Sequence, residues 1–289
     1  MSAWTVDRGC PASCAADPDP RVPFGELARR YATLTYALTR AVARGDRLAE
    51  PSALRAEARA VLSALGVGME GVEDAPFSVR TGGVGTLVVA NHISWLDVVA
   101  LLAVEPVSVL AKREVGRWPV VGALARRAGT RFIDRDGSPR ELPGVVHELA
   151  DCLRGGTSVL VFPQATTWCS ASGGRFRRAA FQAAADAGAP VRPVTVEYRQ
   201  NGGPSTAPAF LGEEDFTASL RRVAGARGLR VRVAARTPLW GTDRRALADA
   251  ARRAVLGAGV VDEACVARGV DPSTGASYGP VATSCCKAA

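Results

Sequence analysis

The fold of this chain is decided by the stretch Thr86-Leu-Val-Val-Ala-Asn-His-Ile-Ser-Trp-Leu-Asp97. Its apolar run over residues 87–90 predicts a buried strand. Ser94 stands three residues before Asp97, which is the spacing of a capping box, and this predicts that a helix begins at Ser94. A strand that enters a helix through a tight turn places His92 and Asp97 near the carboxyl end of the strand. In open α/β sheets, ligands bind at that end.

The chemistry of this turn depends on an imidazole and a carboxylate. The chain has two histidines, so few side chains are candidates for an imidazole base at neutral pH. Asp97 can accept a hydrogen bond from one ring nitrogen of His92 and leave the other free to take a proton from a substrate hydroxyl. That hydroxyl would attack an activated acyl group, so no serine or cysteine nucleophile is required. The alternative is that Asp97 only caps a helix and His92 is a turn histidine.

Strand-like and helix-like segments alternate along the rest of the body. Apolar runs predict further strands at 107–112, 129–134, 158–163, 191–198 and 229–235. Helical periodicity predicts helices at 118–127, 139–154, 176–187 and 244–256. Strands that alternate with helices predict an α/β fold with a mostly parallel central sheet flanked by helices. His147 lies off the apolar stripe of its helix and is interpreted as a surface histidine.

The ends of the chain differ from this body in composition. Residues 1–22 are rich in proline and small residues and predict a flexible leader, and residues 258–289 predict a disordered tail. Residues 23–70 predict an N-terminal helical pair, and residues 71–257 form the α/β domain. The first helix is amphipathic and basic, so it either packs on the core or lies on an anionic membrane surface. Packing is favoured, because an apolar stripe at helical spacing usually faces a core.

Charge and length limit the classes of partner. The 289 residues carry a net charge of +8, which favours phosphate head groups, phosphate-bearing cofactors, acidic carrier proteins or nucleic acid. The alternative is an arginine-rich surface without a specific partner. Nucleic-acid binding is not favoured, because no aromatic platform or recognised motif accompanies the arginines. No stretch reaches 18 apolar residues, so no transmembrane helix is predicted.

Two other kinds of site are excluded by spacing. The seven cysteines are odd in number and contain no C-x2-C pair, so no metal site is predicted and reduced thiols in a cytosolic setting are expected. The glycine cluster at residues 81–85 comes before the first strand of the body. A dinucleotide or P-loop site needs its glycines after the strand, so neither is predicted.

Three further segments end or close predicted strands at the same edge of the sheet as Asn91-His92. Phe132-Ile-Asp-Arg135 ends in an arginine that is well placed to pair with a phosphate. Phe162-Pro-Gln-Ala-Thr-Thr-Trp168 offers threonine hydroxyls and loop amides to an anion. The third is the apolar segment 191–196. Taken singly, Arg135 could form a surface ion pair and Phe162-Pro163 could be ordinary packing.

In this order, the four segments resemble the motif blocks of the glycerolipid acyltransferase family, which is lysophosphatidate acyltransferase-like. The family's first block, Asn-His-x4-Asp, is matched by Asn91, His92 and Asp97. Its second block, a strand that ends in arginine, is matched at Arg135. The remaining two blocks, Phe-Pro-Glu-Gly-Thr and an apolar stretch around proline, correspond to Phe162-Pro-Gln-Ala-Thr166 and to the segment around Pro193.

The resemblance implies transfer of a fatty acyl group from acyl-CoA or acyl-carrier protein to the hydroxyl of a lysophospholipid, first of all 1-acyl-sn-glycerol-3-phosphate, in phospholipid biosynthesis. It implies His92 as the base and Asp97 as its orienting partner. The implied substrate-binding residues are Arg135, Pro163, Gln164, Ala165, Thr166 and Thr167. No metal or cofactor is implied beyond the thioester co-substrate. The implied location is the cytoplasm, with peripheral contact at the inner face of the plasma membrane.

The third block departs from the family pattern. Gln164-Ala165 stands where the family has Glu-Gly. Glutamine keeps the size of glutamate but loses its charge, and alanine in place of glycine matters only where φ is positive or a ligand comes close. This departure leaves open an acyltransferase for another lysolipid, such as a lyso-aminolipid, or a catalytically weak lipid-binding homologue. An esterase or thioesterase is also conceivable, although the Gly-x-Ser-x-Gly elbow of serine hydrolases is missing.

Overall fold

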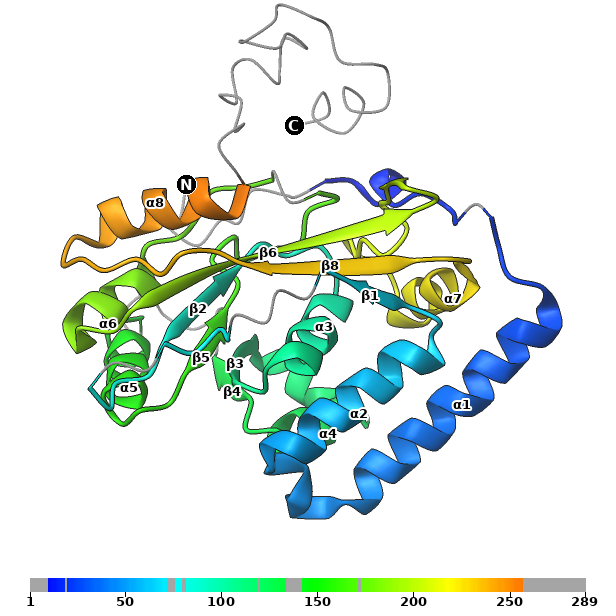
Figure 1. The fold of residues 1–289 in the computed structure, drawn as a ribbon, viewed down its shortest axis with the longest axis horizontal. Helices are drawn as coiled ribbons and strands as arrows, with labels where there is room; N and C mark the ends of the chain where they lie inside the picture. The colour runs from blue at the N-terminus through cyan, green and yellow to red at the C-terminus, as the bar shows by residue number, and fades with distance from the viewer. Residues whose placement is uncertain are drawn as a thin grey trace, which may run out of the picture.

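The fold is a single sheet with helices packed against it (Figure 1). A computed structural model describes residues 10–18, 20–71, 76–79, 82–118, 120–133, 142–170 and 173–256. The predicted tail at 258–289 lies outside these residues. In Figure 1, helix α8 (Arg244–Leu256) lies on one side of the sheet, and α1 (Phe24–Ala43) with α2 (Pro51–Ala64) lies on the other.

The sheet has eight strands in the described part of the chain, and most of them are parallel. Their order is β1-β8-β6-β2-β5-β3-β4, and β7 pairs with β6 beside this path. The strands are β1 (Gly68–Glu70), β2 (Leu87–Ala90), β3 (Ser108–Lys112), β4 (Arg131–Ile133), β5 (Val159–Val161), β6 (Val191–Gln200), β7 (Gly203–Pro204) and β8 (Arg230–Ala235). The β6–β8 and β6–β7 pairs are antiparallel and the other five are parallel. The predicted fold class is therefore confirmed, while β1 was not predicted.

The other helices follow the predicted alternation. They are α3 (Leu96–Val104), α4 (Val121–Arg127), α5 (Leu142–Arg154), α6 (Ala179–Ala187) and α7 (Phe216–Gly225), with short 3-10 helices η1 (Ala12–Cys14), η2 (Gly45–Ala49) and η3 (Arg113–Arg117). Helix α3 begins two residues after the predicted start at Ser94. The break that was predicted between the N-terminal helices is η2.

Strand β2 lies near the middle of the sheet, between β6 and β5. Its four side chains are fully buried and alternate between two cores. Val88 and Ala90 pack in the core that includes α1, α2, α3 and α7, and Leu87 and Val89 pack in the core that includes α5, α6 and α8. Because both faces of β2 are covered, its carboxyl end and the turn that follows are held firmly in place.

Residues 10–18 and 20–22 form hydrogen bonds with the α/β domain, although the sequence predicts a flexible leader there. The backbone N–H of Val22 donates to the carbonyl of Gly225 at 2.9 Å, and that of Arg227 donates to the carbonyl of Pro20 at 3.0 Å. Ala16 donates to the hydroxyl of Thr206 at 3.1 Å. These partners are about two hundred residues away in sequence, so local composition carries no sign of them.

The N-terminal helices pack on the core and on each other. Leu34, Ala37 and Ala41 of α1 are buried, which agrees with the favoured interpretation of its apolar stripe. Glu57 of α2 is buried and accepts hydrogen bonds from Arg40 at 2.8 Å and Arg44 at 2.6 Å. Burial opposes ionisation of Glu57, but these bonds outweigh burial and lower its pKa. Among the described helices, none is both long and apolar enough to cross a membrane.

A buried arginine joins α1 to the ends of two other helices. Nη1 of Arg30 donates to the carbonyls of Leu65 at 2.9 Å, Ala224 at 3.0 Å and Ala226 at 2.8 Å. Its guanidinium also pairs with Glu26 at 2.7 Å. The three carbonyls belong to the last turns of α2 and α7 or follow them, where backbone oxygens lack partners within the helix. Arg30 therefore caps both helices from the side.

We expect Arg30→Met to lower the free energy of unfolding by about 3 kcal/mol, since it leaves buried carbonyls without a donor. Urea unfolding followed by circular dichroism measures this loss. Arg29→Met is the matched control, because Arg29 is exposed on the same helix and should cost no more than about 0.5 kcal/mol. Equal effects of the two substitutions would contradict the capping role.

Candidate active site

The turn between β2 and α3 is organised around the carboxylate of Asp97, which is fully buried. Its Oδ2 accepts hydrogen bonds from the backbone N–H of Ile93 at 2.7 Å and of Ser94 at 2.9 Å. The same oxygen lies 2.9 Å from Nδ1 of His92. Asp97 thus reaches back over the turn as a capping residue and also bonds the imidazole, so capping is not its only contact.

The position of His92 leaves one ring nitrogen for chemistry. A carboxylate accepts but does not donate, so Nδ1 carries a proton, and in the neutral ring Nε2 then presents a lone pair. The ring stacks on Phe162, with 4.0 Å between the ring centroids and 18° between the planes. The side chain is 22% exposed, so it is reached from outside while its orientation is fixed. This is the arrangement of a general base with an orienting partner.

Tyr198 completes the set of donors to Asp97 and was missed from the sequence. Its hydroxyl donates to Oδ1 of Asp97 at 2.7 Å. Burial raises the pKa of Tyr198 well above its ordinary value, and the negative charge of Asp97 adds to this effect. The tyrosine is thus held as a neutral donor. It lies on β6, 101 residues from Asp97, and no local pattern in the sequence points to this pairing.

Asn91 anchors the turn to the same strand. Its amide nitrogen donates to the carbonyl of Val196 at 2.9 Å, and its amide oxygen accepts from the N–H of Val196 at 2.8 Å. The asparagine of the first block therefore has a structural role, because it closes a backbone gap where β2 ends beside β6.

The third-block loop contacts the turn through Gln164, which is buried. Its amide oxygen accepts from the backbone N–H of His92 at 2.6 Å, and its amide nitrogen donates to the carbonyl of Gly173. Both ends of the amide therefore hold the loop to the turn, and the predicted contact of Gln164 with substrate stays a prediction. A glutamate could accept from His92 but could not donate to Gly173, which explains why glutamine fits here.

The other predicted substrate-binding residues differ in whether their polar atoms are already hydrogen-bonded within the protein. The carbonyl of Pro163 accepts from the N–H of Arg177 at 2.8 Å, and the hydroxyl of Thr167 donates to the carbonyl of Phe210. Thr166 is half-buried, and its hydroxyl has no hydrogen bond within the described ranges, so it can bind a ligand. Arg135 lies outside the described residues, and its predicted role stays a prediction.

Ala165 has a left-handed backbone, with φ of 62°. The condition under which the sequence departure from glycine matters is therefore met. We expect Ala165→Gly to raise the free energy of unfolding by about 1 kcal/mol, because alanine is disfavoured in this conformation. Ala32→Gly on the exposed face of α1 is the control and should lower it by about 1 kcal/mol. Thermal unfolding compares the two, and a loss of stability in Ala165→Gly would contradict the expectation.

Four half-buried aromatic side chains gather beside the turn. Trp95 and Trp118 both contact Phe216, with ring centroids 5.1 Å and 5.2 Å apart, and Trp118 lies 6.4 Å from Phe210. Phe210 is tied to the turn, since its N–H donates to the carbonyl of Ile93 at 3.0 Å. These rings form an apolar wall that is joined to the turn through Ile93.

The second histidine takes no part in this site. His147 on α5 is exposed, and its Nε2 lies 3.4 Å from Oδ2 of Asp151. This confirms the interpretation of His147 as a surface residue and leaves His92 as the imidazole of the site.

Comparisons with known proteins agree with this geometry. A family model described as Acyltransferase matches residues 69–197. A lyso-ornithine lipid O-acyltransferase from Pseudomonas aeruginosa is 38% identical over 186 residues, which are 62% of this chain and 71% of that relative. The chain belongs to the acyltransferase family. Residues 69–197 of this acyltransferase include Asn91, His92, Asp97 and Gln164.

Two further matches describe the range of the relatives. This acyltransferase is 38% identical over 175 residues to a 1-acyl-sn-glycerol-3-phosphate acyltransferase from Neisseria meningitidis. The aligned residues cover 61% of this chain and 67% of that relative. The crystal structure of the 1-acyl-sn-glycerophosphate acyltransferase PlsC from Thermotoga maritima superposes with a TM-score of 0.56 at 19% identity, covering 80% of this chain and 92% of that one. The second match supports the fold.

Proposed function

We propose that this acyltransferase moves a fatty acyl group from acyl-CoA or acyl-carrier protein to the hydroxyl of a lysophospholipid, with 1-acyl-sn-glycerol-3-phosphate as the first candidate acceptor. The observation that carries the proposal is the bond of 2.9 Å between Nδ1 of His92 and Oδ2 of Asp97, on a ring that remains 22% exposed. An oriented neutral imidazole can take the proton of an acceptor hydroxyl at Nε2.

The transfer then runs in two steps. The hydroxyl oxygen of the lysolipid attacks the thioester carbonyl carbon while its proton passes to Nε2 of His92. The buried Asp97 stabilises the imidazolium that forms. The carbon–sulfur bond breaks, and the leaving thiolate takes the proton back from Nε2. The products are an ester and a free thiol, and His92 returns to its neutral form without a covalent acyl-enzyme.

The identity of the acceptor is the finer part of the proposal. The two relatives named above act, by their names, on a lyso-ornithine lipid and on 1-acyl-sn-glycerol-3-phosphate. Arg135 and the hydroxyl of Thr166 would bind the phosphate of the second acceptor. The lyso-ornithine lipid is the second candidate, because the relative named for it and the relative named for 1-acyl-sn-glycerol-3-phosphate are equally similar to this chain at 38% identity.

The outer face of α1 supports peripheral contact with a membrane. Phe24 is 86% exposed and Tyr36 is 68% exposed on this helix, and Arg29 is exposed on it as well. Exposed aromatic side chains combined with arginines suit the interface of an anionic bilayer. We propose peripheral contact at the inner face of the plasma membrane, where a lysolipid is reached without leaving the bilayer.

A panel of acceptors tests the proposal. Purified full-length protein receives a labelled acyl thioester and vesicles that contain 1-acyl-sn-glycerol-3-phosphate, lyso-ornithine lipid or 1-acylglycerol in equal amounts. We expect the phosphate-bearing acceptor to give the most labelled lipid and 1-acylglycerol, which lacks the phosphate, to give the least. A larger yield from the lyso-ornithine lipid would select the second candidate. Hydrolysis of the thioester with no labelled lipid from any acceptor would contradict acyl transfer.

A further inference from the structure

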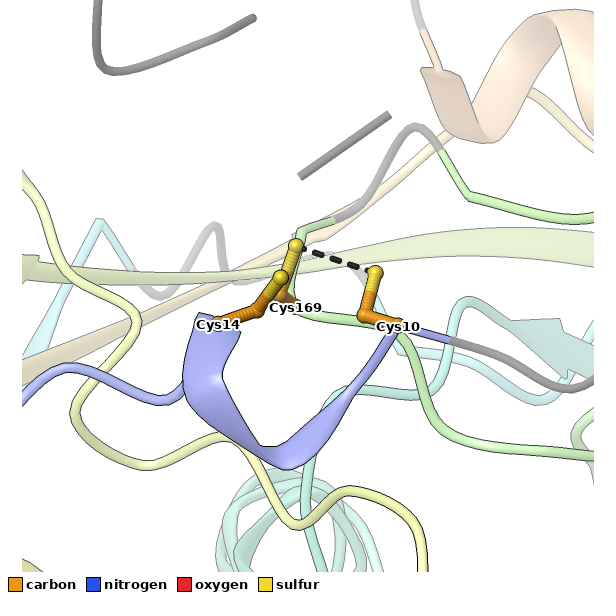
Figure 2. A group of neighbouring side chains, drawn as sticks. All are labelled: Cys10, Cys14 and Cys169. Atoms are coloured by element: carbon orange, nitrogen blue, oxygen red, sulfur yellow. Dashed lines mark hydrogen bonds between the residues drawn. The ribbon is translucent and has the colours of Figure 1, made fainter. Parts of the chain in front are cut away.

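Three cysteines from distant parts of the chain meet beside the third-block loop. Cys10 and Cys14 lie at the two ends of the single turn that contains η1, and Cys169 directly follows the loop, 155 residues after Cys14. Figure 2 shows the three side chains turned toward one another. Their sulfur atoms all lie within 4.8 Å of one another, and the thiol of Cys10 donates to the sulfur of Cys169 at 3.2 Å.

The three thiols lie where the N-terminal segment packs against the larger core. Cys169 is buried, and Cys10 and Cys14 are half-buried against the larger core. A cysteine coordinates a metal ion as its thiolate, and three sulfur atoms within 4.8 Å of one another are close enough to share one ion.

We propose that Cys10, Cys14 and Cys169 bind one soft metal ion, for which zinc(II) is the natural probe. Three thiolates select soft or borderline metals over magnesium and calcium, which prefer oxygen ligands. In a tetrahedral zinc site with Zn–S bonds of about 2.3 Å, the sulfurs lie about 3.8 Å apart. The three sulfurs reach this spacing with displacements of about 1 Å or less. Coordination releases the thiol protons to solvent, and the fourth position is left for water or another ligand.

The proposed site differs from the expectation, drawn from cysteine spacing, that the chain has no metal site. A C-x3-C pair and a single cysteine 155 residues later are not a recognised ligand pattern. The three cysteines come together only in the folded chain, because the N-terminal segment lies against the third-block loop. The site does not depend on the proposed acyl transfer.

Metal binding would join the N-terminal segment to the catalytic turn. Cys169 follows Trp168, whose backbone N–H donates to the carbonyl of His92 at 2.8 Å. An ion bound by Cys169, Cys10 and Cys14 would attach this loop to the N-terminal segment and restrict its movement. The three cysteines are positioning residues in this account, since none of them is placed at the reacting atoms.

Cobalt(II) titration tests the site, because thiolate ligands give cobalt an intense absorption band that zinc abolishes. The protein is a full-length variant in which the four other cysteines are replaced by serine; these are Cys152, Cys265, Cys285 and Cys286. Under anaerobic reducing conditions, we expect one cobalt per chain with the thiolate band, and its displacement by one equivalent of zinc. Absence of the band, or a band that persists when Cys10, Cys14 and Cys169 are all serine, would overturn the proposal.

Single replacements separate metal binding from folding. Cys10 and Cys14 lie outside the sheet. In the same background, we therefore expect Cys10→Ser and Cys14→Ser to keep the wild-type circular dichroism spectrum and to weaken zinc binding at least about 100-fold. Thiol titration gives an independent readout: we expect the three thiols to be protected from a thiol reagent by zinc and to react again after a chelator is added. Zinc affinity unchanged in both variants would overturn the proposal, as would a Cys10–Cys169 disulfide that forms equally with zinc present.

Discussion

Replacing His92 with alanine is expected to lower kcat for lysolipid acylation by about 10³-fold or more, because the substitution removes the base that accepts the proton of the acceptor hydroxyl. KM for the thioester should change little, since His92 acts on the reacting hydroxyl. Initial rates with labelled thioester and lysolipid vesicles measure both constants. Circular dichroism shows whether the variant is folded once the ring no longer stacks on Phe162.

His147→Ala is the matched control for this substitution. His147 is the second histidine of the chain and lies exposed on α5, paired with Asp151. Its replacement should leave kcat within about twofold of the wild type, since exposed sites tolerate such changes. If His92→Ala and His147→Ala had equal rates in folded proteins, the role of His92 would be refuted.

Asp97→Asn is expected to lower kcat by about 10²- to 10³-fold while the fold is kept. The amide oxygen can take the position of Oδ2 and accept from Ile93, Ser94 and the His92 ring. The amide nitrogen then faces the hydroxyl of Tyr198, which can accept in place of donating. The capping geometry survives, but the negative charge that stabilises the imidazolium is lost.

Steady-state rates combined with thermal unfolding separate these two contributions. We expect Asp97→Asn to unfold within a few degrees of the wild type and yet to be slow. Tyr198→Phe is the control that removes one donor to Asp97 while the charge stays, and its kcat should fall by less than that of Asp97→Asn. An Asp97→Asn variant with wild-type kcat would mean that Asp97 serves only as a helix cap.

Local patterns predicted the elements that carry the site. The apolar run 87–90 gave β2, and the Ser94–Asp97 spacing indicated both the start of α3 and the carboxylate that reaches back over the turn. His92 and Asp97 could be paired from the sequence because their bond closes within five residues. The parallel sheet followed from the alternation of strands with helices.

Long-range contacts were beyond such patterns. Tyr198 meets Asp97 only because β6 lies beside β2 in the sheet, and strand order is not written in either segment. In the sequence, Arg30 resembles a solvent-facing residue of a basic helix, but in the fold it donates to carbonyls at the end of α7. Cys10 and Cys169 are 159 residues apart. In each case the missing information is which distant backbone or side chain the fold brings near.

The central claim is that the acceptor's own hydroxyl is the nucleophile and His92 is its base. The most direct test follows the label of an acyl thioester that is incubated with the enzyme first alone and then with lysolipid. We predict no label on the protein at the first stage and label in the lipid at the second. Label bound covalently to the protein before the acceptor is added, and then chased into the lipid, would contradict the account.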